Sequence, residues 1–412
     1  MKRFCAGLVL LVFVFAAHSV SAAPYAYITQ VLDGTVTVLD MVKNKKVATI
    51  DVGGAPFAIA MSTDGRKAYV SSQGYPAGWV SVIDVLTHVV TDTIPLGNGY
   101  PIGTALLPNG TKLYVLAYPG ITVIDTATNT VQTIIPFGID QWAVAAHPDS
   151  SKVYVTDYDD NTVAVIDTAS QTISQTISVG DGPGGIAVHP DGTKVYVAND
   201  WGQNVSVIDT STNNITETIS LPGYPDQVVF NPTGTRAYVT SWESSSVWVI
   251  DTGSRTVIAD IYVGPTDGGG VDVSPDAAFV YVTTNYYDDI KDKRVNDGVK
   301  VIDASTNTVK KKIKLPSEPV SMGKFIGGPQ FRMTVQKAGL GSGKVISKKL
   351  PDIDCGSKCE ADFYVNRKVQ LQAVPDAGFV LTGWSGDCTG KGKTCKFVVT
   401  KDYSVTATFE PK

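Results

Sequence analysis

The sequence predicts an all-β protein made of seven repeated units and a separate, smaller C-terminal domain. The first observation is a segment ending in Asp, such as "VID", that recurs at intervals of 41 to 52 residues. The second is a Tyr followed by Val or Ile, which occurs once in each unit. The third is that the repeats stop near residue 328, beyond which four of the five cysteines lie.

The first 22 residues predict a secretory signal peptide. Lys2 and Arg3 precede an apolar run over 8–17, and small residues follow as far as Ala22. This order of charge, short apolar core and small residues is typical of an export signal, and the run is shorter than the ~20 residues that span a bilayer. We expect cleavage after Ala22, no membrane span in the mature chain, and a location in the periplasm, on the cell surface or outside a bacterial cell.

Each repeated unit contains four short runs rich in Val, Ile, Thr and Tyr, separated by Gly, Asn, Asp and Pro, which are strand and turn signals. A period near 42 residues with four strands is typical of a β-propeller blade. The recurring aspartates are Asp40, Asp84, Asp125, Asp167, Asp209, Asp251 and Asp303. Seven copies predict a seven-bladed β-propeller over residues 23–328.

The two ends of the repeats complete one blade between them. The first unit begins with "YAYIT" and lacks its innermost strand, whereas "PVSMGKFIGG" follows the last unit as a surplus strand. We therefore expect 319–326 to lie beside Tyr25–Thr29 and to close the ring, which removes the open sheet edges.

The repeated segments "VYVTD", "VYVAN", "AYVTS" and "VYVTTN" resemble the YVTN-type β-propeller repeats of exported bacterial and archaeal proteins. The resemblance covers roughly 24–328 and implies the fold, while leaving the function open. Relatives of this fold leave two alternatives to a binding protein. One is a periplasmic hydrolase or lactonase that uses the carboxylates leading into the innermost strands, namely Asp140, Asp181, Asp226 and Asp267. The other is a cofactor-free subunit of a periplasmic redox complex, resembling the heavy subunits of quinoprotein amine dehydrogenases.

Repetition also assigns structural roles to residues that would otherwise suggest catalysis. An Asp directly after the third strand can accept hydrogen bonds from backbone N–H groups two or three residues later and close a turn. His88, His147 and His189 also fall in turns of the repeat. We expect no catalytic residue, no metal site and no cofactor.

The loops between second and third strands carry aromatic and acidic residues at the other end of the predicted ring. Such side chains offer stacking faces and negative charge, which suit cationic or hydroxyl-rich partners. The candidate binding residues are Tyr75, Trp79, Tyr118, Tyr158, Trp201, Trp242, Tyr286, Asp159 and Asp226. The alternative is that these side chains only pack loop against loop.

Residues 329–412 predict a small β domain of different character. The sequences "GSGKV", "DCGSKC", "GWSGDC" and "VTATF" resemble the divergent internalin-B-type bacterial repeat. Four cysteines allow three pairings, of which we favour the local pairs Cys355–Cys359 and Cys388–Cys395. Such cross-links would compensate for a thin core.

Charge separates the same two regions. The tail carries 13 basic and 8 acidic residues, whereas the full chain has a net charge of −5. The acidic propeller disfavours nucleic-acid phosphates as a partner. The sequence therefore predicts a monomeric, exported binding or scaffold protein rather than an enzyme, with an extracellular or periplasmic protein, peptide or glycan as its partner.

Overall fold

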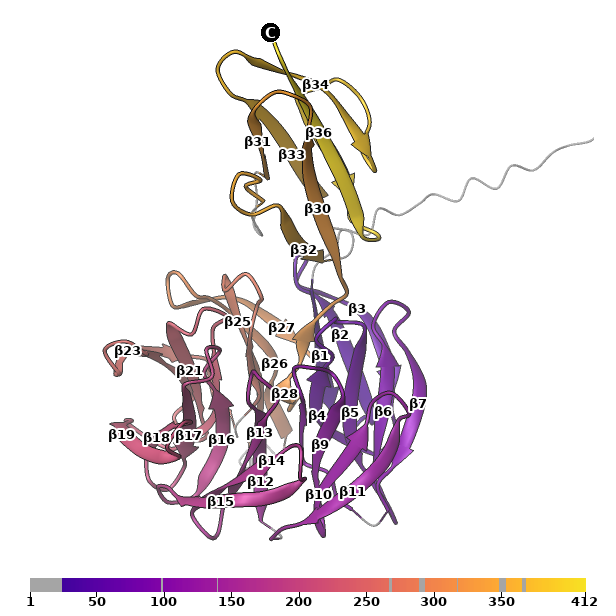
Figure 1. Cartoon of the computed structure of the whole chain (residues 1–412). Helices are drawn as coiled ribbons and strands as arrows, with labels where there is room; N and C mark the ends of the chain where they lie inside the picture. Colours follow the sequence, from indigo (N-terminus) through magenta and orange to yellow (C-terminus); the bar gives the residue numbers. More distant parts are fainter. Residues whose placement is uncertain are drawn as a thin grey trace, which may run out of the picture.

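The computed structural model describes residues 24–412 except 98, 139, 267–268, 289–292, 317, 348–352 and 365–367, and side chains within 287–297 are also not described. The expected signal peptide lies outside the described residues. Every described element is a strand. The strands form a ring-shaped propeller and a smaller β domain that stands on one end of it (Figure 1).

The propeller has seven blades, each a four-stranded antiparallel arrangement, as predicted. Seven consecutive groups of strands build it in chain order. They are β1 (Tyr25–Gln30), β2 (Thr35–Asp40), β3 (Lys45–Asp51); β4 (Ala55–Met61), β5 (Lys67–Gln73), β6 (Trp79–Asp84), β7 (Val89–Pro95); β8 (Gly103–Leu106), β9 (Lys112–Ala117), β10 (Gly120–Asp125), β11 (Thr130–Pro136); β12 (Gln141–Ala146), β13 (Lys152–Asp157), β14 (Thr162–Asp167), β15 (Thr172–Ser178); β16 (Pro183–Val188), β17 (Lys194–Asn199), β18 (Asn204–Asp209), β19 (Asn214–Ser220); β20 (Pro225–Phe230), β21 (Arg236–Ser241), β22 (Ser246–Asp251), β23 (Thr256–Tyr262); β24 (Val271–Val273), β25 (Phe279–Asp288), β26 (Lys293–Asp303), β27 (Thr308–Lys314). The first group has three strands of its own, and the chain returns to supply its fourth.

The returning segment closes the ring. Strand β29 (Ile326–Gly327) pairs antiparallel with β1, and Pro319 forms an isolated bridge with Gln30 at the other end of that strand. Between these points β28 (Met322–Lys324) leaves β1 and pairs in parallel with β4 of the next blade. The predicted closure is confirmed at both ends, and the middle of the segment differs because it bulges toward the centre of the ring.

A buried carboxylate adds to the hydrogen bonds that hold this closing segment on β1. The Oδ2 atom of Asp272 accepts hydrogen bonds from the backbone N–H groups of Phe325 at 3.0 Å and Ile326 at 2.8 Å, while Oδ1 accepts one from Val273 at 2.8 Å. Asp272 is 5% exposed, and burial raises its pKa to about 6. The last complete blade is thereby attached to the strand that completes the first.

The core lies between neighbouring blades. The repeat tyrosines are almost completely buried, because each lies on the second strand of its blade and packs toward the next sheet. They are Tyr27, Tyr69, Tyr114, Tyr154, Tyr196, Tyr238 and Tyr281. Outermost strands such as β15 and β19 are largely exposed, with a single buried position in each.

The seven recurring aspartates close turns, as predicted. Each accepts at least one hydrogen bond of 2.7 to 3.1 Å on Oδ1 from a backbone N–H group two or three residues later. These backbone bonds hold the pKa of Asp125, Asp167 and Asp251 below the usual value for a carboxyl group.

Two histidines join blades at the same end of the ring. The Nε2 atom of His147 lies 2.8 Å from the carbonyl oxygen of Gly192, and that of His189 lies 2.9 Å from the carbonyl oxygen of Gly234. His88 contacts the hydroxyl of Tyr27 through Nδ1 at 3.0 Å. All three histidines occupy turns, so their contacts account for them as structural residues.

The tail has two sheets and its own core. One sheet has the order β32-β30-β36-β34 and the other β31-β33-β35. The strands are β30 (Gln330–Ala338), β31 (Gly343–Ser347), β32 (Glu360–Tyr364), β33 (Lys368–Pro375), β34 (Phe379–Gly386), β35 (Thr394–Val398) and β36 (Tyr403–Pro411). Both local disulfides, Cys355–Cys359 and Cys388–Cys395, are present, which confirms the predicted pairing. Trp384 is buried in this core.

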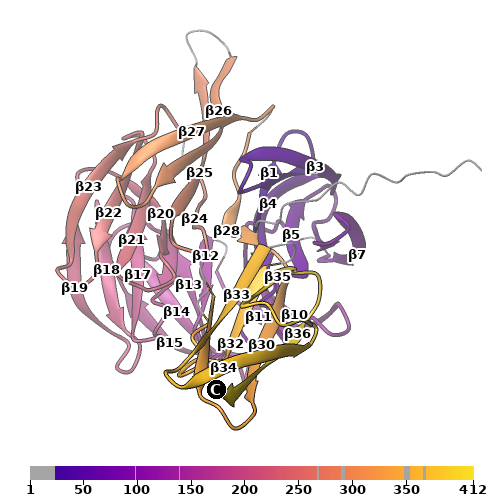
Figure 2. The same cartoon turned by 90° about the horizontal axis from the view of Figure 1, so that it is seen from above.

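The tail stands on the end of the propeller formed by the turns between first and second strands. The N–H of Gln330 donates to the carbonyl oxygen of Asp64 at 3.4 Å, and the guanidinium of Arg66 lies 5.4 Å from the ring centre of Phe331. Gly65 has a φ of +66°, and a Cβ there would collide with the backbone of Gly328. Seen from above, the tail overlies part of the ring (Figure 2).

Reduction of the disulfides should destabilise the tail and leave the propeller folded. Both cross-links lie within the separate tail core, and they close short loops, so each contributes about 2 kcal/mol by the chain-entropy estimate. Hydrogen exchange measured with and without reductant should show lost protection in β30–β36 alone. Equal loss of protection in the blades would contradict this independence.

The free energy of unfolding should depend on pH in part through Asp272. Its pKa is raised in the folded protein, so its stabilising contribution is complete below about pH 4 and is lost as the pH rises through about 6. The loss amounts to about 3 kcal/mol. In urea titrations, Asp272→Asn should remove this part of the decrease between pH 4 and 7, whereas Asp226, whose pKa is also raised to about 6, keeps its own part.

Asp167→Asn is the matched control for that experiment. The pKa of this turn aspartate is lowered, so its contribution is lost only on acidification below about pH 4. The decrease between pH 4 and 7 should therefore persist in this variant. A decrease of the same size in Asp272→Asn would show that another group causes it.

Candidate binding site

The loops at the end of the ring opposite the tail bring four aromatic rings together. Trp142 and Tyr158 have ring centres 5.7 Å apart, and Trp201 and Tyr224 have ring centres 5.8 Å apart in an edge-to-face arrangement. Tyr158 and Trp201 meet over Gly182, where a Cβ would lie 2.5 Å from the indole ring. We call these four residues the aromatic rim; they come from three consecutive blades.

The aromatic rim combines packed and exposed surfaces. Trp201 is 64% exposed and Trp142 is 37% exposed, so both indoles present area to solvent. The hydroxyl of Tyr158 donates to Oδ2 of Asp200 at 2.9 Å, which fixes the phenol against the next blade. Edge-to-face contacts of this kind hold rings in place and leave faces free for a partner.

Carboxylates border the aromatic rim. Asp140 and Asp157 both have raised pKa values, first because of desolvation and further because of Asp160, which lies near both. Asp159 adds to the same effect and is exposed. This mutual repulsion means that a cation placed beside Tyr158 would relieve unfavourable electrostatic energy.

The predicted site residues do not form one continuous surface. Tyr158 and Trp201 belong to the aromatic rim. Trp242 lies next to the rim and is 45% exposed, and its backbone N–H donates to the carbonyl oxygen of Tyr224 at 3.0 Å. Tyr75 and Tyr118 are 94% and 55% exposed on the loops of other blades.

Three further predicted residues have other surroundings. The Nε1 atom of Trp79 donates to the carbonyl oxygen of Val52 at 3.0 Å, and its ring packs over glycines of its own and the preceding blade. The side chain of Trp79 therefore packs between loops and is not part of a binding surface. Tyr286 is half-buried in the long β25–β26 hairpin. Asp226 accepts hydrogen bonds from Gln227 and from the N–H of Gly269, both at 3.1 Å, and burial raises its pKa to about 6.

The carboxylates of the hydrolase alternative can be placed in part. Asp226 joins its blade to the next one through Gly269, and Asp140 lies beside the aromatic rim. Asp267 lies outside the described residues. Over the described ranges, no group of three or more His, Cys, Asp or Glu residues is arranged to hold a metal ion.

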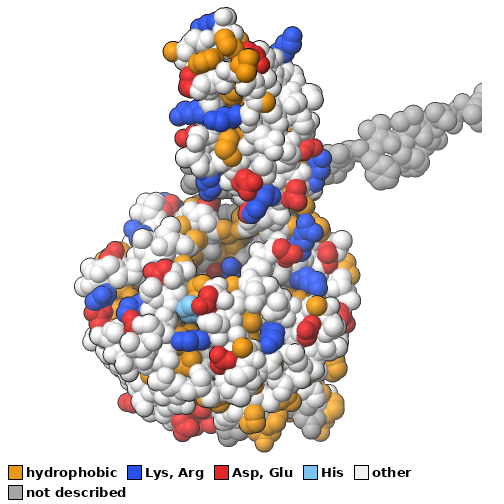
Figure 3. Space-filling view, viewed as in Figure 1, with side chains coloured by type: hydrophobic (Ala, Val, Ile, Leu, Met, Phe, Trp, Pro, Cys, Tyr) orange, Lys and Arg blue, Asp and Glu red, His pale blue; other side chains and the backbone are white. Residues whose placement is uncertain are grey.

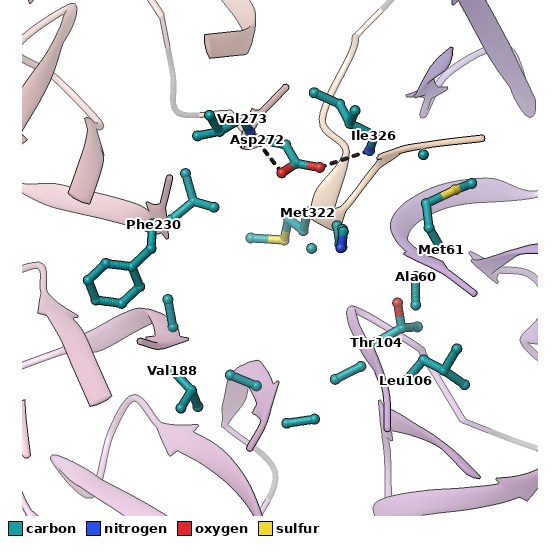
Figure 4. Close-up of a pocket in the computed structure, with 18 of the residues that line it drawn as sticks. Ala60, Met61, Thr104, Leu106, Val188, Phe230, Asp272, Val273, Met322 and Ile326 are labelled. Atoms are coloured by element: carbon teal, nitrogen blue, oxygen red, sulfur yellow. Dashed lines mark hydrogen bonds between the residues drawn. The ribbon is translucent and has the colours of Figure 1, made fainter. Parts of the chain in front are cut away.

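The centre of the ring contains a cavity that the sequence pattern does not predict. It has a volume of about 610 Å³ and is lined by the innermost strands, by the closing segment and by Gln330 and Tyr364 of the tail. Figure 3 shows the hollow on the propeller face below the tail, and Figure 4 shows its walls with Asp272 and Met322.

One sequence signal for this cavity was available. Asp272 lies opposite the repeat tyrosine Tyr281, a position at which five other blades have Ala or Val. The corresponding residues are Ala60, Ala105, Ala145, Ala187 and Val229. A charged residue in this series indicates a special role on an innermost strand.

Comparisons with known proteins agree with these two parts. Residues 121–241 match the family model of the YNCE-like β-propeller, and residues 356–412 match that of the divergent InlB B-repeat domain. The seven-bladed β-propeller protein Rv1057 of Mycobacterium tuberculosis is 33% identical over 115 residues, which are 27% of this chain and 29% of that protein. The matched region thus spans less than a third of this relative. Both resemblances drawn from the sequence are confirmed.

Solved structures show the same fold. A functionally unknown protein from Desulfotomaculum acetoxidans superposes with a TM-score of 0.61 and 15% identity, over 73% of this chain and 100% of that chain. Hydrazine synthase of Kuenenia stuttgartiensis superposes with a TM-score of 0.54 and 21% identity, over 71% of this chain and 99% of that chain. At these identities the likeness concerns the fold alone.

The Tyr158–Asp200 hydrogen bond should be visible in a titration. Desolvation raises the pKa of Asp200, and the Tyr158 hydroxyl opposes that shift by donating to the carboxylate. Tyr158→Phe should therefore raise the pKa of Asp200 further, as measured by NMR of the carboxyl carbon. Tyr118→Phe, on another blade, is the control and should leave it unchanged. An unchanged pKa in Tyr158→Phe would show that the bond is not formed in solution.

Proposed function

We propose that this chain is an exported, non-enzymatic binding or scaffold protein whose aromatic rim takes a basic segment of a partner protein or peptide. The observation that carries the proposal is the set of four touching aromatic side chains on three consecutive blades, bordered by carboxylates. Loops that depart from a repeat are where repeat folds usually place recognition.

The chemistry of the rim favours a cation. Lys and Arg side chains gain about 0.5 to 1 kcal/mol over an exposed aromatic face, with Trp the best ring. Trp142 and Trp201 offer such faces, and Asp140 and Asp159 supply negative charge next to them. Hydroxyl-rich glycans also stack on aromatic rings, but they would gain little from the acidic border.

Export is supported by the disulfides. Two cross-links in one small domain are typical of proteins that fold outside the reducing cytosol. Across the described ranges no helix is long and apolar enough to cross a membrane. We propose a periplasmic or extracellular location and a monomeric state, in line with the signal expected over 1–22.

Binding should depend on the two exposed indoles. We expect that Trp142→Ala combined with Trp201→Ala weakens binding of a Lys-rich peptide selected on a peptide array by ~10-fold or more, about 1.4 kcal/mol. Tyr262→Ala is a suitable control, because Tyr262 is 69% exposed on an outermost strand, away from the rim. Calorimetry at low and high salt should show weaker binding at high salt, where the carboxylates are screened.

Two results would overturn the proposal. One is equal peptide binding by the folded double variant and the parent protein. The other is selection of neutral glycans, with no basic peptide bound, on combined peptide and glycan arrays. Circular dichroism and a thermal unfolding curve show whether each variant is folded.

A further inference from the structure

The cavity in the centre of the propeller is a second site, which extends toward the tail and reaches the aromatic rim only at Trp142. At about 610 Å³ it falls within the range of small-molecule sites in proteins. Its walls reach the turns between first and second strands, and Gln330 and Tyr364 of the tail form part of its border. The propeller and the tail therefore build this site together.

The space exists because the innermost strands carry small side chains. Ala60, Ala105, Ala145 and Ala187 all lie opposite repeat tyrosines, and all four line the cavity. Val188, Phe230 and Met322 add larger apolar surfaces to the wall (Figure 4). A ligand that filled this space would place most of its surface against hydrocarbon, which favours an apolar body.

One cation lines this apolar wall. Lys324 belongs to β28, the part of the closing segment that bulges toward β4, and it pairs with Ala60. Its side chain is exposed, lines the cavity, and forms no ion pair with any residue that the structure describes. An ammonium group beside an apolar cavity is the feature that an amphipathic anion requires.

Asp272, a carboxylate that lines the same cavity, does not act as an ion-pair partner of Lys324. Asp272 and Lys324 influence each other electrostatically, but the two oxygens of Asp272 already accept three backbone hydrogen bonds. Asp272 is also 5% exposed, so a ligand reaches little of it. Lys324 is the charged group of the wall that remains available.

The tail limits what can enter. The phenol of Tyr364 is half-buried at the border of the cavity, and burial raises its pKa to about 12, so its hydroxyl stays protonated at neutral pH. Its hydroxyl and the side-chain amide of Gln330 are hydrogen-bonded to each other, and both are neutral polar groups at the border of the cavity. Gln330, Tyr364 and Lys324 line one cavity of about 610 Å³, a volume that suits a small molecule rather than a folded partner.

We propose that this cavity binds a small amphipathic monocarboxylate, with its apolar body against the alanine-lined wall and its carboxylate on Lys324. This inference goes beyond the proposed function, because the cavity and the aromatic rim share only Trp142. The two sites can therefore be tested separately.

The test compares three ligands of equal chain length on the full-length mature protein. Decanoate and decylammonium are titrated below their micellar concentrations, and decanol below its solubility limit, by calorimetry. Decanoate should bind at least 10-fold more tightly than decanol, and decylammonium should bind most weakly. Equal affinity for all three would show that binding is hydrophobic and does not depend on the headgroup, which would overturn the proposal.

Three variants locate the binding. Lys324→Met should abolish the preference for decanoate over decanol while leaving decanol binding unchanged. Lys312→Met, on the exposed outermost strand β27, is the matched control and should behave like the parent. Ala187→Leu should weaken all binding by filling the cavity. Unaltered decanoate binding in a folded Lys324→Met or Ala187→Leu protein would contradict the proposal.

Trp201→Ala separates this site from the aromatic rim. Trp201 does not line the cavity, so this variant should retain decanoate binding even where peptide binding is lost. Decanoate binding that fell with Trp201→Ala would place the ligand at the rim and contradict the cavity assignment. Loss of peptide binding alone leaves the cavity site intact.

Discussion

The hydrogen bonds between Asp272 and the closing segment are the contact on which the rest of the propeller depends. A ring of blades is closed only if the last unit is attached to the first, and here β29 contributes only two residue pairs to β1. Asp272 adds two charge-assisted bonds from the last complete blade to the same segment. Such bonds are stronger than neutral ones, although the effect of burial on the carboxylate exceeds theirs, so that its pKa is raised to about 6.

Closure also shapes the centre of the ring. Asp272 fixes the backbone at Phe325 and Ile326, and the residues just before them pair with β4 and place Lys324 at the cavity. The same segment then leads through Gly328 to the tail. A single stretch of chain thus closes the propeller, lines its cavity and positions the second domain.

The repeat separates structural residues from those free to vary. Turn aspartates and buried tyrosines recur because each blade must form the same turn and pack on its neighbours in the same way. Loops at the opposite end carry no such requirement, so Trp142 and Trp201 can differ from their counterparts in other blades. The two ends of the ring therefore differ in chemistry, with an aromatic, acidic surface at one end and an apolar cavity beside the tail at the other.

The sequence by itself determined the strands, the number of blades, the ring closure, the turn role of residues such as Asp167 and the local disulfides. These features follow from short-range patterns and from counting repeats, so no knowledge of distant contacts is needed. Only the tertiary structure decided which loop aromatics meet: Trp79 packs over glycines, whereas Tyr158 joins Trp201 across a blade boundary. It also decided the roles of Asp272 and Lys324. Asp272 accepts a hydrogen bond from Phe325, 53 residues later, and Lys324 pairs with Ala60 on β4 of another blade. Contacts between residues so distant in sequence depend on how complete blades pack, and the pattern within a single blade does not contain that information.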